Sequence, residues 1–219
     1  INCFTGQALV NPLDYDDYFD VKKLVTLENL FEHRCHFGHD ARCRNPYMKP
    51  YLFGSRTGID IFDLEKTVPL FQAALNVVAH IAYRGGIILF ISRQKATMHL
   101  VEETAQNCEE YAHCRYWNPG LFTDSRNVFG HTARLPDLCI FLHTQNSVFR
   151  THRAVSDSAK LLIPSVGVVD SNCDPRLITY PIPGSDDSFF SVRQYLNIFE
   201  KTIQIAKAKR AEDGLEDDV

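Results

Sequence analysis

Apolar residues along the chain form two kinds of pattern, short continuous runs and longer stretches with helical spacing. Runs such as IILFIS and DLCIFLH are apolar at almost every position, as expected for strands that are covered on both faces of a sheet. The longer stretches repeat an apolar residue every three or four positions, which predicts amphipathic helices. The predicted strands cover residues 87–92, 113–117, 137–143, 165–170 and 177–182, and the predicted helices cover residues 64–84, 95–108, 147–162 and 185–210.

The alternation of strands and helices predicts the fold class. Strands separated by helices of about ten or more residues form βαβ units, which build a parallel sheet. Their crossovers are right-handed, so helices lie on both faces of the sheet. The sequence therefore predicts an α/β fold, a flavodoxin-like doubly wound parallel sheet. Pro69 fits only the first turn of its helix, so that helix is expected to begin within residues 64–68.

The N-terminal part of the chain has a different character. Residues 1–23 are acidic, aromatic and irregular in pattern, and we expect them to lie on a partner or to stay loose. Helical spacing predicts one short helix over residues 21–33. The Gly- and Pro-rich residues 36–56 are expected to form a long ordered loop, followed by an edge strand at residues 58–63. The expected organisation is an N-terminal extension at residues 1–23, a single α/β domain at residues 24–208 and a charged C-terminal tail at residues 209–219.

The composition is that of an ordinary globular protein, with 45% hydrophobic and 23% charged residues. The formal net charge of -4 and the pI near 6.1 exclude a uniformly basic nucleic-acid-binding module, so any contact with RNA must come from local patches. No apolar run approaches the roughly 20 residues of a membrane span. Seven cysteines without a CxxC motif predict reduced thiols in a reducing compartment.

Polar residues follow the predicted strands at the sheet edge where folds of this class bind ligands. Asp170 ends the strand at residues 165–170 and Asp174 follows it, so an enzyme could use both as magnesium ligands or acid–base groups. The chain contains no GxGxxG or P-loop motif, and Asp, Asn and Ser before Pro175 also suit a simple turn. We therefore favour a turn over a nucleotide- or magnesium-binding enzyme site.

The segment PIPGSDDS precedes the last predicted helix and offers an acidic loop. Ser185 is a good N-cap residue, and Asp186 and Asp187 then lie in the first helical turn. There the carboxylates meet free N–H groups and the positive end of the helix dipole. We interpret these residues as a helix cap rather than as a metal-binding loop.

The stretch around Gly38 offers a possible zinc site. Its pattern C-H-x2-H-x3-C contains competent zinc ligands, although structural zinc sites have tighter paired spacings. We favour a structural loop in which the histidines satisfy backbone groups, and we predict no metal and no other cofactor. The possible zinc ligands are Cys35, His36, His39 and Cys43, and the residues expected to order the loop are His36, His39, Asn45 and Pro46.

Basic side chains interleaved with aromatic ones are the most informative chemical feature. Cations suit RNA phosphates, and exposed rings suit bases or riboses. On pattern alone, this interpretation and a scatter of solvated charges are equally supported. The candidate RNA-binding residues are Arg42, Arg44, Lys49, Arg56, Arg93, Lys95, Arg115, Tyr116, Trp117, Arg126 and Arg134.

Several long motifs occur in one order along the chain. They are HFGH, NPYMKPYLFGSR, IDIFDLEKTVPLF, GGIILFISRQKA, YWNPGLFT, LPDLCIFL, IPSVGVVDSNCDP and PIPGSDDS. On these motifs the chain resembles family two of the small-subunit ribosomal proteins, from about residue 27 to the final helix.

The resemblance implies a flavodoxin-like structural protein that is not an enzyme. Members of that family attach to the solvent side of the small ribosomal subunit, between head and body, where they contact ribosomal RNA and neighbouring proteins. It further implies that residues 36–56 contact RNA or order the domain edge, and that Arg93, Lys95 and residues 115–120 face RNA phosphates. No membrane and no homo-oligomer are expected.

Two departures from the bacterial members of that family point to a compartment. Bacterial members carry a long helical hairpin where this chain has only residues 124–134, and this chain adds an acidic, aromatic extension in front. Together with the free cysteines and a start at Ile1, these features predict a nuclear-encoded protein of the mitochondrial small ribosomal subunit, imported by a transit peptide. The contacts of the hairpin are then expected to be lost or taken over by neighbouring proteins, including mitochondria-specific ones.

Overall fold

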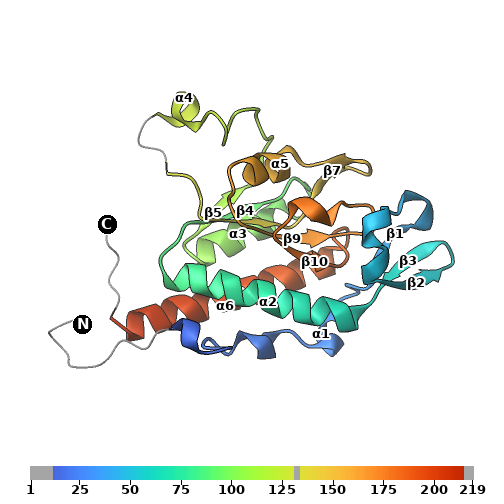
Figure 1. The fold of residues 1–219 in the computed structure, drawn as a ribbon, viewed down its shortest axis with the longest axis horizontal. Helices are drawn as coiled ribbons and strands as arrows, with labels where there is room; N and C mark the ends of the chain where they lie inside the picture. The colour runs from blue at the N-terminus through green and yellow to red at the C-terminus, as the bar shows by residue number, and fades with distance from the viewer. Residues whose placement is uncertain (1–11, 131–133, 215–219) are drawn as a thin grey trace.

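The computed structural model describes residues 12–130 and 134–214 and contains a five-stranded sheet at its centre (Figure 1). The strand order is β10-β9-β6-β4-β5, and every neighbouring pair is parallel. This order confirms the predicted α/β fold with a doubly wound parallel sheet. The strands are β4 (Ile88–Ile91), β5 (Tyr111–His113), β6 (Leu138–Phe141), β9 (Ser165–Val169) and β10 (Tyr180–Pro183).

Helices lie on both faces of the sheet (Figure 1). One face carries α2 (Leu64–Tyr83), α3 (Met98–Asn107) and α6 (Phe189–Glu212), which pack against one another. The other face carries α5 (Arg153–Lys160) and the short α4 (Ser125–Phe129). None of the helices in the described ranges has the length and hydrophobicity that crossing a lipid bilayer requires.

The core is divided by the sheet into two apolar layers. All four residues of β6 are buried, with Ile140 in the layer under α2 and α6 and Phe141 in the layer under α5. Strand residues alternate between faces, so a strand between two helical layers must be apolar throughout. In the first layer, Phe199 packs against Phe71 with ring centroids 5.6 Å apart. Each such fully buried side chain contributes about 1.5–3 kcal/mol of hydrophobic free energy.

Several predicted element boundaries were wrong. Strand β5 lies at Tyr111–His113 rather than over residues 113–117. The helix predicted over residues 147–162 begins only at Arg153, because the preceding residues form a hairpin of β7 (Gln145–Ser147) and β8 (Arg150–Thr151).

Helix α2 begins at Leu64, within the predicted range, but Pro69 lies in its second turn rather than in its first. Its ring removes the N–H that would bond to the carbonyl of Glu65. Both Pro69 and Glu65 are exposed, so water can satisfy that carbonyl and the helix continues.

The region predicted as a long loop is instead a small antiparallel sheet at one end of the molecule (Figure 1). Its central strand is the one that was predicted at the edge. Gly38 lies within the first strand of this small sheet. A Cβ at this position would approach Ser171 Oγ to 3.0 Å, so the glycine permits a close contact and does not interrupt the strand. The elements are β1 (Phe37–Asp40), β2 (Leu52–Arg56) and β3 (Ile59–Phe62), in the order β1-β3-β2, with 3-10 helices at Ala41–Cys43 and Pro46–Tyr51.

The helix predicted over residues 21–33 is divided in two. A 3-10 helix at Val21–Leu24 ends at an extended Val25, and α1 (Leu27–Glu32) follows it. Thr26 begins α1 as its N-cap, since its hydroxyl accepts a hydrogen bond from the N–H of Asn29 at 3.3 Å. The apolar spacing was correct but could not reveal this interruption.

The described part of the predicted extension packs against the α/β domain. Phe19 and Val21 are fully buried in the first apolar layer. The Tyr18 hydroxyl donates to Asp213 Oδ2 at 3.1 Å, and Lys209 Nζ lies 4.5 Å from the centre of the Tyr18 ring. The rest of the expected extension, residues 1–11, and residues 215–219 of the expected tail lie outside the described residues.

Candidate nucleic-acid interface and strand-end cluster

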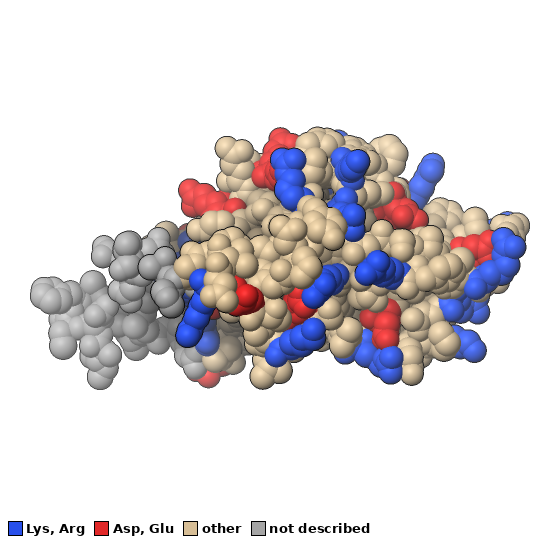
Figure 2. Space-filling view, turned by 90° about the horizontal axis from the view of Figure 1, so that it is seen from above, with Lys and Arg blue, Asp and Glu red and all other residues tan. Residues whose placement is uncertain are grey.

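The candidate RNA-binding cations are spread over the surface instead of merging into one patch. Figure 2 shows the face that carries α4 and α5, where Lys and Arg side chains alternate with acidic and uncharged residues. This dispersion agrees with the negative net charge. The pairing and exposure of each candidate therefore decide whether it can reach RNA.

Two arginines near β1 have opposite surroundings. The Arg42 side chain is 89% exposed and forms an ion pair with Asp40 at 2.7 Å, which lowers the pKa of that carboxyl to about 2. Arg44 instead donates from Nε to Oδ2 of Asp60 at 2.8 Å, and Asp60 is fully buried. The Arg44 guanidinium thus neutralises a buried charge, so it is a structural residue rather than a free cation.

Lys49 and Arg56 are exposed and form no ion pair with any described residue. The segment that carries Lys49 is anchored to the core, because the preceding residue, Met48, is fully buried. Asn45 begins this 3-10 helix by accepting a hydrogen bond from the N–H of Tyr47 at 3.0 Å, with Pro46 at its first position. Asn45 and Pro46 thus define the start of this 3-10 helix.

A third group follows β4 and β5. The Arg93 guanidinium lies over the Tyr116 ring at 5.4 Å, and that ring is 64% exposed. Lys95 is exposed beside them, and Arg115 is paired with Glu102 at 3.5 Å. This group joins a cation to an exposed ring, which is the combination that stacks on RNA bases.

Trp117 does not belong to an RNA-facing surface. Its indole is buried and its Nε1–H donates to Asp157 Oδ2 at 3.1 Å. The Phe122 ring meets it edge-on with centroids 4.7 Å apart. Sequence pattern could not separate it from the exposed Tyr116 beside it, since both are aromatic residues next to an arginine.

Arg126 and Arg134 flank residues 131–133, which lie outside the described ranges. Arg126 is exposed on α4, and Arg134 pairs with Asp137 at 2.9 Å. Surface pairs of this kind are weak, so Arg134 stays available to a phosphate.

Four titratable residues meet at the carboxyl edge of the sheet. His39 of β1 places Nδ1 at 3.1 Å from Asp170 Oδ1 and Nε2 at 3.3 Å from Asp187 Oδ2. Asp186 completes the strand-end cluster, and one ligand atom from each residue lies within 4.8 Å of the others. One imidazole and three carboxylates form a donor set that suits a divalent cation.

The prediction that Ser185, Asp186 and Asp187 cap the last helix was wrong. Helix α6 begins at Phe189 after Ser188, so these residues precede it. The Ser185 N–H donates to the carbonyl of Cys35 at 3.0 Å, which turns Asp186 into the interior.

Burial and neighbouring charges shift the pKa values of two residues in the strand-end cluster. Burial together with the charge of Asp170 raises the pKa of Asp186 well above its usual range. The hydrogen bond to Asp170 raises the pKa of His39, against the opposing effect of burial. Asp174 is not part of this cluster, because it pairs with Arg176 at 2.7 Å, so the Asp170–Asp174 pair considered for an enzyme is not assembled.

The possible zinc ligands do not converge. Cys35 is buried, and burial raises the pKa of its thiol. His36 stacks on Phe31 with centroids 4.5 Å apart, and its Nδ1 has no partner among the described residues, so it does not satisfy the backbone as predicted. Of the four candidates, only His39 belongs to a group whose ligand atoms are close enough for an ion.

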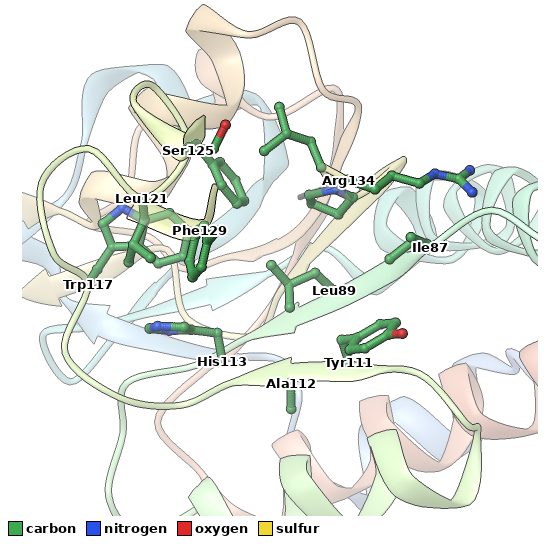
Figure 3. Close-up of a pocket in the computed structure, with 13 residues that line it drawn as sticks. Ile87, Leu89, Tyr111, Ala112, His113, Trp117, Leu121, Ser125, Phe129 and Arg134 are labelled. Atoms are coloured by element: carbon green, nitrogen blue, oxygen red, sulfur yellow. The ribbon is translucent and has the colours of Figure 1, made fainter. Parts of the chain in front are cut away.

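An apolar cavity of about 540 Å³ lies beside β4 and β5, and no sequence motif indicated it (Figure 3). Leu89 and Tyr111 come from the strands, while Leu121 and Phe129 face them from the segment that contains α4. Among the described residues that line it, Arg134 is the single one with a permanent charge.

Comparison with known proteins identifies the family. The family model described as Ribosomal protein S2 matches residues 30–149 and 129–206. A bovine protein named small ribosomal subunit protein uS2m is 52% identical over 206 residues, covering 94% of this chain and 70% of the relative. Small ribosomal subunit protein uS2 of Tolumonas auensis is 32% identical over 222 residues, covering 84% of this chain and 92% of the relative.

The bacterial comparison also shows that this chain lacks residues that the relative has. Its alignment is longer than the whole chain of 219 residues although it covers only 84% of it, so the bacterial protein has additional residues. The two family-model matches meet between residues 129 and 149, next to α4. This agrees with the expected absence of the bacterial hairpin. The matches extend over most of the chain and follow its order, and the chain therefore belongs to the ribosomal protein S2 family, whose members are structural proteins rather than enzymes.

Proposed function

We propose that this protein is a structural component of the mitochondrial small ribosomal subunit. Its 52% identity with bovine uS2m over 94% of the chain supports this assignment to mitochondrial translation. We further propose that it binds small-subunit ribosomal RNA and neighbouring proteins near the head–body junction on the solvent side. Neighbours without bacterial counterparts, and a single copy without self-association, are part of the same proposal.

The group formed by Arg93, Tyr116 and Lys95 carries the RNA-binding part of the proposal. An exposed ring with a guanidinium over it offers a base a stacking surface, and Lys95 adds a charge for a phosphate. Lys49 and Arg56 extend the same chemistry to the small sheet, because both are exposed and unpaired among the described residues. Arg44 and Trp117 are not part of the proposed RNA-binding surface, because each donates a hydrogen bond to a buried carboxylate.

A double substitution tests this assignment. Arg93→Ala with Lys95→Ala removes two exposed cations without touching the core, and we expect the variant to dissociate from purified small subunits at lower salt than the wild type. The affinity falls with increasing salt, and each lost phosphate contact makes the slope of log affinity against log salt concentration less steep by roughly 0.7–0.9. Sedimentation of the subunits through a salt series measures the change.

A matched control removes the same charge elsewhere. Arg193 and Lys201 are exposed on α6, so Arg193→Ala with Lys201→Ala changes the net charge equally. We expect this control to dissociate like the wild type. Equal salt sensitivity in both double variants would show that net charge, and not the group at β4, sets the affinity.

A further inference from the structure

The sheet is incompletely covered on one side at β4 and β5. In β4, Ile88 and Phe90 point into the layer under α2 and α6 and are fully buried. Leu89 points to the opposite face and is only half-buried, and Tyr111 of β5, its register partner on that face, is 61% exposed. A parallel sheet normally has both faces covered, so this part of the surface lacks a packing layer.

The cavity occupies the place of that missing layer (Figure 3). Its floor is formed by Leu89 and the β5 residues, and its wall by Trp117, Leu121 and Phe129, all apolar or aromatic. One polar atom remains unsatisfied there, because His113 Nδ1 is buried without a hydrogen-bond partner among the described residues. An apolar partner with one hydrogen-bonding group fits this lining.

Helix α4 beside the cavity leaves two large apolar side chains exposed within the described part of the chain. Val128 is 50% exposed and Phe129 is 56% exposed, although α4 has only 5 residues. Helices this short owe their stability to tertiary packing and not to their own hydrogen bonds. Two large apolar side chains in solvent on such a helix indicate that another element packs there in the assembled protein.

From these observations we infer that the cavity between β5 and α4 is a docking site for an α-helix of a neighbouring protein in the small ribosomal subunit. The inference rests on the proposed function, since the subunit supplies the neighbour. The described residues give this apolar lining one cation, Arg134, and a single phosphate contact adds little affinity for RNA, so the lining favours protein over RNA. A helix is favoured over an added strand because β5 has only 3 residues to pair with.

The inference predicts which side chains of the neighbour enter the cavity. Apolar residues spaced three or four apart on one helix face would contact Leu89 and Phe129, because that spacing forms a continuous stripe. A polar side chain on the same stripe would hydrogen-bond His113 Nδ1.

Photo-crosslinking in the assembled particle tests the occupant. A benzophenone amino acid is placed at Tyr111 or at Phe129 of the full chain, which is produced in cells that lack the endogenous protein, and the purified small subunits are irradiated. We expect both positions to crosslink to one peptide of one neighbouring subunit protein, at residues three or four apart. Crosslinks to RNA, to a second copy of this chain, to residues 131–133, or to nothing would overturn the inference.

Two substitutions test whether docking supports assembly. Tyr111→Glu and Phe129→Glu each place a charge on an exposed side chain of the cavity lining, so neither disturbs a buried residue. We expect association with the subunit to weaken by about tenfold, with an unchanged thermal unfolding midpoint of the isolated protein. Leu162→Glu is the control, because Leu162 is 89% exposed and lies outside the cavity lining.

The outcomes separate this inference from the proposed function. Normal assembly of both cavity variants would refute the docking site and leave subunit membership intact. Failure of the unmodified protein to sediment with small subunits would instead refute the proposed function itself.

Discussion

At the scale of single residues, burial decides the role of side chains that look equivalent in the sequence. Arg42 and Arg44 are two positions apart and both pair with an aspartate, but Asp40 is solvated and Asp60 is fully buried. A solvated pair adds little to stability, whereas a buried carboxylate without its partner is costly. The two arginines should therefore contribute very differently to the stability of the fold.

We expect Arg44→Ala to destabilise the protein by roughly 3 kcal/mol, because it leaves the buried Asp60 charge unpaired. Arg42→Ala should change the free energy of unfolding by less than about 1 kcal/mol. Urea unfolding of both variants measures the difference. Adding Asp60→Asn to Arg44→Ala should restore part of the loss; similar unfolding midpoints for the two single variants would disprove the assigned roles.

His152 gives the folded protein a defined sensitivity to acid. It is fully buried at the start of α5, where Nδ1 accepts a hydrogen bond from the N–H of Ala154 at 3.2 Å. Burial, aided by the charge of Arg93, lowers the pKa of the imidazole to about 4. In the unfolded chain this imidazole has a pKa near 6.5, so between pH 6.5 and pH 4 it is protonated there but stays neutral in the folded protein. The free energy of unfolding therefore falls as the pH drops from 6.5 to 4.

His152→Asn keeps an N-cap side chain and removes this titration. We expect the variant to lose less stability than the wild type between pH 7 and pH 4, by roughly 3 kcal/mol at the acid end. Chemical unfolding at a series of pH values measures the slope. The exposed His99, changed to Asn, serves as the control and should leave the profile unaltered; an equal slope in His152→Asn would contradict the assignment.

At the scale of elements, the strand-end cluster ties the small sheet to the α/β domain. His39 comes from β1, Asp170 follows β9, and Asp186 and Asp187 precede α6. Neighbouring backbone bonds join the same parts, such as the N–H of Asn45 to the carbonyl of Ser171 at 2.8 Å. The orientation of the small sheet therefore depends on electrostatics as well as on apolar packing.

We expect Asp186→Asn to raise the free energy of unfolding at pH 7 in the presence of a chelator, by on the order of 1 kcal/mol, since it removes a buried charge beside Asp170. The pKa of Asp186 is raised in the folded state, so the advantage should disappear as the pH falls toward 4. Asp174→Asn, outside the cluster, is the control. Repeating the measurement with added Zn²⁺ tests cation binding, because a bound ion would make Asp186→Asn less stable than the wild type. If the variant is less stable than the wild type in chelator, the assigned unfavourable effect of the Asp186 charge is refuted.

At the scale of the whole molecule, helices cover the two faces of the sheet to different extents. One face is covered by three packed helices, while the other has α5 over β9 and only the short α4 over β4 and β5. Dispersed cations and an apolar cavity share that second face (Figures 2 and 3). A protein of net charge -4 can in this way combine local RNA contacts with an apolar docking site for a neighbouring protein.

The sequence predicted what depends on local order along the chain. Periodic apolar residues located all five strands of the parallel sheet to within a few residues and the helices α2, α3 and α6. Its motifs indicated the family that the comparisons confirmed. It failed on the small sheet, because Gly38 is typical of both a loop and a close approach between strands. It also failed on Asp186, because the local pattern of a helix cap is the same whether or not the helix begins there.

What the sequence determined by itself was the fold class and the family, since both are encoded in the spacing and order of residues along the chain. Only the tertiary structure decided that Arg44 and Trp117 are buried partners of carboxylates, that Asp186 meets His39, and that the sheet is open beside α4. The physical reason is that solvation, pKa and packing depend on neighbours brought together from distant parts of the chain. Periodicity reveals which way a side chain points, and folding alone determines what it meets there.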